Sequence, residues 1–141
     1  MEYKEFIQTV HERTGLSRQE AADLTRATLG CLAARLSGGE AVQLAMQLPD
    51  GLREYVATGT PNKQADRFGV DEFVRKVSEH TGLTLDETTH GVGAVLATLR
   101  DAVSDDEFDD VMAQLPTGFG ALVQQAQRSA PPAGRPGVVG G

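Results

Sequence analysis

Residues Leu36 to Val56 read LSGGEAVQLAMQLPDGLREYV, and this stretch decides the fold because it occurs twice. Residues Val103 to Val123, which lie 67 positions later, read VSDDEFDDVMAQLPTGFGALV. The two segments align without a gap, and Ser, Glu, the run Gln-Leu-Pro, a Gly and a Val fall in register. In each copy, Ser with Glu three residues later predicts a capping box at the start of a helix. Proline then ends that helix and can begin the next one.

The repeat extends backwards to the start of the chain. Apolar residues at i, i+3, i+4 and i+7 predict a helix from about Glu2 to Arg13, which a left-handed Gly15 ends. Ser17 and Glu20 then predict a capping box for a long helix that reaches about Leu36. The second copy repeats these signals at Val70, Phe73, Val74, Val77, Gly82, Thr84 and Glu87, and its long helix reaches about Val103.

Four helices in each copy make eight in all. The sequence therefore predicts an all-α fold of two tandem four-helix repeats, packed into one bundle-like domain with a disordered C-terminal tail. The expected boundaries are 1–60 for the first repeat, 61–69 for a linker, 70–128 for the second repeat and 129–141 for the tail. The tail is rich in Pro and Gly without periodicity. A unit of about 60 residues is marginally stable alone, so the copies are expected to share an interface.

One difference between the copies indicates where they meet. Gly91 and Gly93 replace Leu24 and Arg26 inside the long helix. Glycine inside a helix costs about 1 kcal/mol relative to alanine. We therefore expect another helix to cross there, namely the long helix of the first copy near Leu24 to Cys31.

The composition excludes several classes of protein. The 141 residues carry a net charge of −7, which argues against a nucleic-acid groove. No apolar segment approaches the roughly 20 residues that span a bilayer, and the N-terminus lacks the pattern of a signal peptide. Cys31 is the only cysteine and cannot form an internal disulfide, which fits a reducing cytoplasm.

Several side chains are candidates for chemistry, but each has a simpler interpretation. The histidines lack the i, i+4 spacing of a metal site and are expected at the surface. Cys31 has no base nearby in sequence and is expected to be a buried small hydrophobe. Besides Cys31, the candidates are the histidines His11, His80 and His90, the arginines Arg13, Arg18, Arg26 and Arg35, and the acidic run Asp105, Asp106, Glu107, Asp109 and Asp110.

The arginines are expected to form the solvated face of two helices, and the acidic run to form a capped, solvated helix start. The run lacks the ligand spacing of an EF-hand, and acidic side chains in a first turn are favoured by the helix dipole. Residues 37–40, Ser-Gly-Gly-Glu, resemble an anion-binding loop. No lysine follows as in a phosphate-binding loop, however, and the capping box uses the same amides.

The segments EFIQTVHERTGLSRQEA, LAARLSGGEA and AMQLPDGLREYV, with the echoes EFVRKVSEHTGL and VMAQLPTGF, resemble the bacterial family called Domain of Unknown Function 2267 (DUF2267). The resemblance covers about residues 2–127 and implies a small, soluble, all-helical tandem-repeat protein. It brings no catalytic residue, cofactor or substrate. Arg53 and Tyr55 become Gly120 and Leu122 in the second copy, so a surface role of the Leu-Pro-x-x-Leu-Arg pattern would belong to the first copy.

The predicted function is that of a non-enzymatic helical interaction or accessory protein of the bacterial cytoplasm. The alternative is a small-ligand binder or an enzyme with a pocket between the two repeats. We expect another protein as the partner, and neither nucleic acid nor a membrane, while the choice between monomer and homodimer stays open. No catalytic, cofactor-binding or metal-binding residue is assigned.

Overall fold

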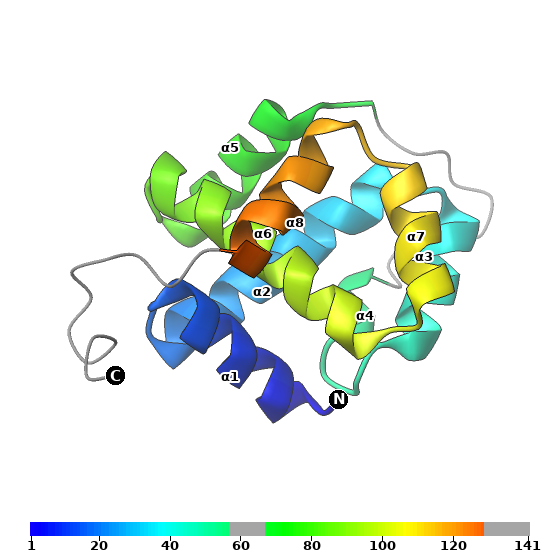
Figure 1. Cartoon of the computed structure of the whole chain (residues 1–141), viewed down its shortest axis with the longest axis horizontal. Coiled ribbons are helices and arrows are strands. Elements are labelled where there is room, and N and C mark those ends of the chain that lie inside the picture. Colours follow the sequence, from blue (N-terminus) through cyan, green and yellow to red (C-terminus); the bar gives the residue numbers. More distant parts are fainter. Residues whose placement is uncertain (57–66, 129–141) are drawn as a thin grey trace.

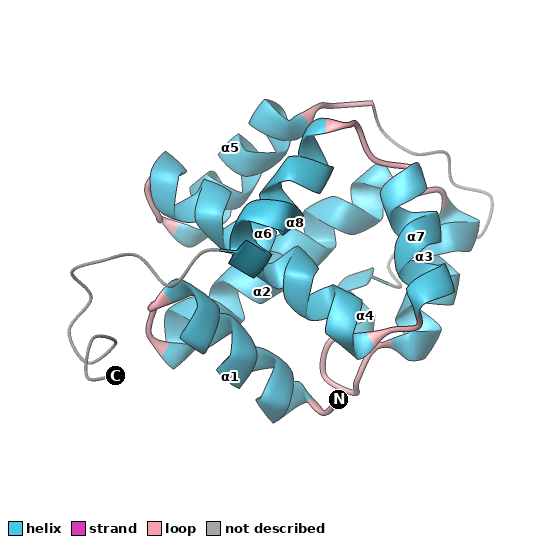
Figure 2. Cartoon of the chain, in the orientation of Figure 1, coloured by secondary structure: helices cyan, strands magenta, loops and turns pink. Residues whose placement is uncertain are grey.

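The computed structural model describes residues 1–56 and 67–128, and these residues form eight helices and no strand (Figures 1 and 2). The all-α prediction is therefore confirmed. The helices are α1 (Tyr3–Thr14), α2 (Arg18–Arg35), α3 (Gly38–Gln47), α4 (Arg53–Val56), α5 (Val70–Thr81), α6 (Leu85–Ala102), α7 (Asp105–Ala113) and α8 (Gly118–Arg128). The predicted tail and most of the predicted linker lie outside the described residues.

The helix boundaries recur along the two halves of the chain. Helices α1 and α5 have 12 residues each, and α2 and α6 have 18 residues each. Gly15 and Gly82 end α1 and α5 in the left-handed region, with φ of 74° and 76°, as predicted. Both capping boxes of the long helices, at Ser17 and Thr84, are also present.

The prediction that a proline begins the fourth helix needs a correction in both halves. In the second half, α8 begins at Gly118, two residues after Pro116. Pro49 does not begin a helix, because the chain first makes a turn in which Leu52 N–H donates to the Pro49 carbonyl at 3.1 Å. Gly51 has φ of 95° in this turn, and α4 begins only at Arg53. A left-handed residue cannot continue a right-handed helix, so the helix starts after it.

The two halves interlock rather than lie end to end. The long helices α2 and α6 contact each other, α1 packs on α6, and α5 packs on α2. Each half therefore covers the long helix of the other half with its first helix. Helices α3 and α7 contact each other at one side of the molecule (Figure 1). Among the described residues, no helix is long and apolar enough to cross a membrane.

One hydrophobic core runs through both halves and takes side chains from every helix. Phe6 of α1, Phe73 of α5 and Phe119 of α8 are fully buried, and the rings of Phe73 and Phe119 meet edge to face at 4.9 Å. A core shared in this way makes the free energy of folding of each half depend on the other half.

The glycines of α6 mark two different helix contacts. A Cβ built on Gly91 would lie 2.6 Å from the Leu24 side chain of α2, which confirms the predicted crossing by the first long helix. A Cβ on Gly93 would lie 2.4 Å from the carbonyl oxygen of Leu122. The prediction that α2 also crosses at Gly93 is therefore wrong, because α8 of the same half occupies that side of α6.

Candidate functional site

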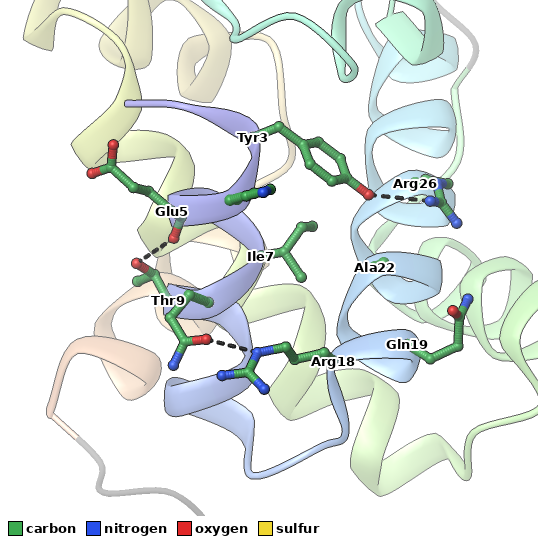
Figure 3. A pocket seen from close by; sticks show the side chains of 10 residues that line it. Tyr3, Glu5, Ile7, Thr9, Arg18, Gln19, Ala22 and Arg26 are labelled. Carbon is green, nitrogen blue, oxygen red and sulfur yellow. Dashed lines mark hydrogen bonds between the residues drawn. The ribbon is translucent and has the colours of Figure 1, made fainter.

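A groove of about 730 Å³ runs between α1 and α2 (Figure 3). Ile7 and Ala22 form its apolar floor, and both are buried. They face the groove because helical residues three or four positions apart share a face, which places Ile7 beside Tyr3 and Ala22 beside Arg18 and Arg26. The groove is therefore a feature of the first half alone.

Two hydrogen bonds join the helices across the groove. At one end, Arg26 Nη2 donates to the Tyr3 hydroxyl at 3.1 Å, and at the other end Arg18 Nε donates to Gln8 Oε1 at 2.9 Å (Figure 3). Arg26 also pairs with Asp23 at 3.2 Å. These bonds hold the polar side chains at fixed places around the apolar floor, as in a preformed binding surface.

The rim of the groove carries more basic than acidic side chains in a chain whose net charge is −7, although Asp23 pairs with one of them, Arg26. Lys4, Arg18 and Arg26 line it, against a single acidic side chain, Glu5. The residues 67 positions after the three basic ones are Asp71, Leu85 and Gly93. The second half therefore does not reproduce this charged rim. At Gly93, the absence of a side chain lets the backbone of α8 lie close to α6.

The local sequence pattern does not predict this groove. The apolar period of residues 2–13 predicts a core-facing position for Tyr3 and Ile7, and Arg18 and Arg26 are predicted to face solvent. Arg26 is half-buried against the Tyr3 hydroxyl, and its guanidinium lies 6.0 Å from the centre of the Tyr55 ring. The signal in the sequence was the loss of both Arg18 and Arg26 from the second copy.

The three histidines do not come together. The rings of His11 and His80 bond to backbone carbonyls of their own half, those of Leu16 and Lys76. His90 is half-buried, and its Nε2–H donates to the Arg13 carbonyl of the other half at 3.2 Å. His11 and His90 are thus less exposed than predicted because each ring packs against a helix end.

Cys31 is half-buried, so the prediction that it is a buried small hydrophobe is only partly correct. Burial raises the pKa of this thiol, and the nearby charge of Lys76 opposes that rise. A thiol with a raised pKa is a poor nucleophile at neutral pH.

Two of the four arginines join the halves instead of facing solvent. Arg13 donates to the Thr98 hydroxyl at 2.9 Å and pairs with Asp101 at 3.1 Å. Arg35 is buried, and its Nη2 donates to the Gln114 carbonyl at 3.2 Å. The prediction of a solvated arginine face is therefore wrong for both, because their contacts come from the other half of the chain.

The capping boxes predicted at Ser37 and Ser104 are only half formed. Each Ser side chain caps its helix, accepting from Glu40 N–H and Glu107 N–H at 3.2 Å. The reciprocal bond to each Ser N–H comes from the other half: Gln114 Oε1 accepts from Ser37 N–H at 2.9 Å, and Gln47 Oε1 accepts from Ser104 N–H at 2.7 Å. This exchange explains the Gln of the repeated Gln-Leu-Pro run.

The exchange frees the Glu40 and Glu107 carboxylates from their own helix caps. They meet between α3 and α7 together with Asp110, each offering an oxygen within 4.8 Å of the others. Glu107 is only 5% exposed, so the prediction that it belongs to a solvated helix start is wrong. Asp105 and Asp106 of the same run are exposed, as expected.

A second cavity of about 390 Å³ lies on the outer side of α3, lined by Val42, Ala45, Met46 and Arg53. Arg53 donates to the Leu48 carbonyl at 2.8 Å and pairs with Asp50 at 3.0 Å. Its guanidinium therefore fixes the turn before α4, which is a structural role for the arginine that the second half replaces with Gly120.

Together these features define an all-α protein of interlocked helices with an open, positively rimmed groove on its first half. The chain belongs to the family described as Uncharacterized conserved protein (DUF2267), whose sequence model matches residues 3–122. The resemblance found in the sequence is thereby confirmed. No match to a curated protein was found.

Proposed function

We propose that this protein is a non-enzymatic interaction module, and that the groove between α1 and α2 receives an acidic, amphipathic helix of a partner protein. The observation that carries the proposal is the basic rim of Lys4, Arg18 and Arg26 around an apolar floor, in a chain that is otherwise acidic. A helix whose apolar stripe lies in such a groove is a common mode of peptide recognition.

The shape of the groove favours a helix over a small molecule. All its lining residues belong to α1 and α2, so it has two walls and an open side. A small ligand is usually bound with 70–90% of its surface buried, whereas a helix needs only its apolar face covered. Acidic side chains beside the apolar stripe would meet the basic rim and increase the association rate.

A binder of small anionic amphiphiles is the second candidate. The groove volume of about 730 Å³ lies within the range of small-molecule sites, roughly 300–1,000 Å³. The groove lies within the first half, however, whereas the predicted ligand pocket lies between the two halves. A cytoplasmic location is part of the proposal, and the single Cys31 supports it.

Nuclear magnetic resonance with two model peptides tests the proposal. Both are 18-residue helices with leucine at i, i+3, i+4 and i+7, and they differ only in carrying Glu or Lys beside that stripe. The Glu peptide should shift the amide signals of Ile7 and Ala22, and the Lys peptide should not. Arg18→Glu should weaken binding of the Glu peptide at least tenfold, the equivalent of about 1.4 kcal/mol.

Arg100→Glu is the matched control, since Arg100 is an exposed arginine of α6 outside the groove. This variant should bind the Glu peptide within about twofold of the wild type, because surface charge outside an interface mainly changes association rates. If neither peptide shifts the α1 and α2 signals, the interaction proposal fails. If decanoate shifts them and the peptides do not, the small-ligand candidate replaces it.

A further inference from the structure

The three carboxylates between α3 and α7 come from positions that the fold brings together. Glu40 and Glu107 are each the third residue of their helix, and α3 contacts α7 (Figure 1). Asp110 follows Glu107 by three residues and therefore shares its face of α7. Because the glutamines of the opposite half cap Ser37 and Ser104, neither glutamate is engaged in a capping box.

Buried oxygens in this cluster have no hydrogen-bond donor. Glu107 is 5% exposed, and its Oε2, like Oε2 of Glu40, is buried without a hydrogen-bond partner among the described residues. In residues 1–56 and 67–128, no ion pair reaches Glu40, Glu107 or Asp110. A buried carboxylate oxygen without a partner destabilises the fold. A cation bound in the cluster would therefore stabilise the folded state.

The pKa of Glu107 also indicates that negative charge is unfavourable in this cluster. Burial, the adjoining carboxyl group of Glu40 and the charge of Asp110 together raise the pKa of Glu107 to about 8. Three carboxylates so close cannot all be ionised without compensation.

We propose that Glu40, Glu107 and Asp110 bind a divalent cation of the oxygen-preferring class, Ca²⁺, Mg²⁺ or Mn²⁺, between the two halves of the protein. Carboxylate oxygens are the ligands that these cations prefer. Ligand distances of about 2.4 Å allow two oxygens on opposite sides of a Ca²⁺ ion to lie about 4.8 Å apart. Each of the three carboxylates offers an oxygen within 4.8 Å of the other two, so the cluster lies inside this limit.

The surroundings leave room for the rest of a coordination shell. A cavity of about 290 Å³ adjoins Glu107 and is lined by Gln43, Met46 and Gln47 of α3. Gln43 is exposed and lies 67 positions before Asp110, so it stands at the corresponding position of the facing helix. Water in this cavity can complete the six to eight ligands that Ca²⁺ takes, and the cavity gives the cation access.

Calorimetric titration of the full chain, freed of metal with a chelator and then dialysed, tests the site. CaCl₂, MgCl₂ and MnCl₂ serve as probes. At least one should bind saturably with one cation per chain and raise the melting temperature. Glu107→Gln and, separately, the exposed Asp110→Asn should weaken that binding at least about tenfold. Asp106→Asn, which removes an exposed carboxylate of the same helix turn, should bind within about twofold of the wild type.

Two results would overturn the site. One is that no cation binds the wild type with a dissociation constant below about 10 mM, a value well above the dissociation constants of known protein sites for Ca²⁺. In that case Glu107→Gln alone would raise the melting temperature, and the carboxylates would share a proton instead. The other is equal binding by Asp106→Asn, Asp110→Asn and Glu107→Gln, which would place the cation elsewhere on the acidic surface.

Discussion

Replacing Gly93 with alanine should destabilise the protein, although alanine is the better helix former. The added Cβ would lie 2.4 Å from the Leu122 carbonyl oxygen. A carbon and a carbonyl oxygen normally stay about 3.3 Å apart, so α8 would have to move by roughly 0.9 Å. The obstacle is backbone and cannot be relieved by a change of rotamer.

The expected size follows from two opposing effects. Overpacking a closely packed site costs about 1–3 kcal/mol, and replacing a helical glycine with alanine returns about 1 kcal/mol. Gly93→Ala should therefore lower the free energy of unfolding by up to about 2 kcal/mol. Urea unfolding followed by circular dichroism measures it, with the slope of free energy against urea unchanged.

Gly30→Ala is the matched control, because Gly30 lies inside the other long helix, is exposed and has no atom within 4 Å of a built Cβ. It should raise the free energy of unfolding by up to about 1 kcal/mol through helix propensity alone. If Gly93→Ala is as stable as Gly30→Ala, α8 does not approach α6 as closely as the structure has it, and the reasoning is refuted.

Gly82→Ala should lower the free energy of unfolding by about 1 kcal/mol, since Gly82 has φ of 76°; a variant as stable as the wild type in urea would contradict this. Gln47→Ala should cost about 0.5–1.5 kcal/mol, because it removes the cap on Ser104 N–H. Glu107 has a pKa of about 8 when folded, above its ordinary 4.5, so the folded state retains a proton that the unfolded state releases. In chelator, stability should therefore fall between about pH 4.5 and pH 8, by at most about 1.4 kcal/mol per pH unit, and the fall should vanish in Glu107→Gln.

Local signals in the sequence were enough to predict most of the helices. Gly15 ends α1 and Ser17 with Glu20 begins α2 through bonds that span three or four residues, so the pattern alone determines them. Gly91 could be predicted as a crossing point because an unfavourable glycine in a helix needs a tertiary reason. Gly93 could not be assigned to the correct neighbour, since both α2 and α8 lie close to α6.

The candidate sites depend on contacts that the local sequence does not contain. The local sequence predicts that Glu107 is a solvated first-turn residue. In the structure, however, Gln47, which is far away in the chain, accepts the hydrogen bond from Ser104 N–H that Glu107 would accept in a capping box. The local sequence predicts that Arg35 is a surface charge, but in the structure it donates a hydrogen bond to the Gln114 carbonyl of the other half. The groove between α1 and α2 depends on the angle at which the two helices pack. The apolar pattern of each helix does not determine that angle, so the groove could not be predicted.

The two halves should fold as one unit, because each covers the long helix of the other. Amide hydrogen exchange on the full chain tests it most directly, since it measures opening free energies residue by residue. The slowest amides of α2, at Leu29 and Leu32, should exchange with the same free energy as those of α6, at Leu96 and Leu99. Protection of α6 that persists where α2 has already exchanged would show that the halves unfold separately.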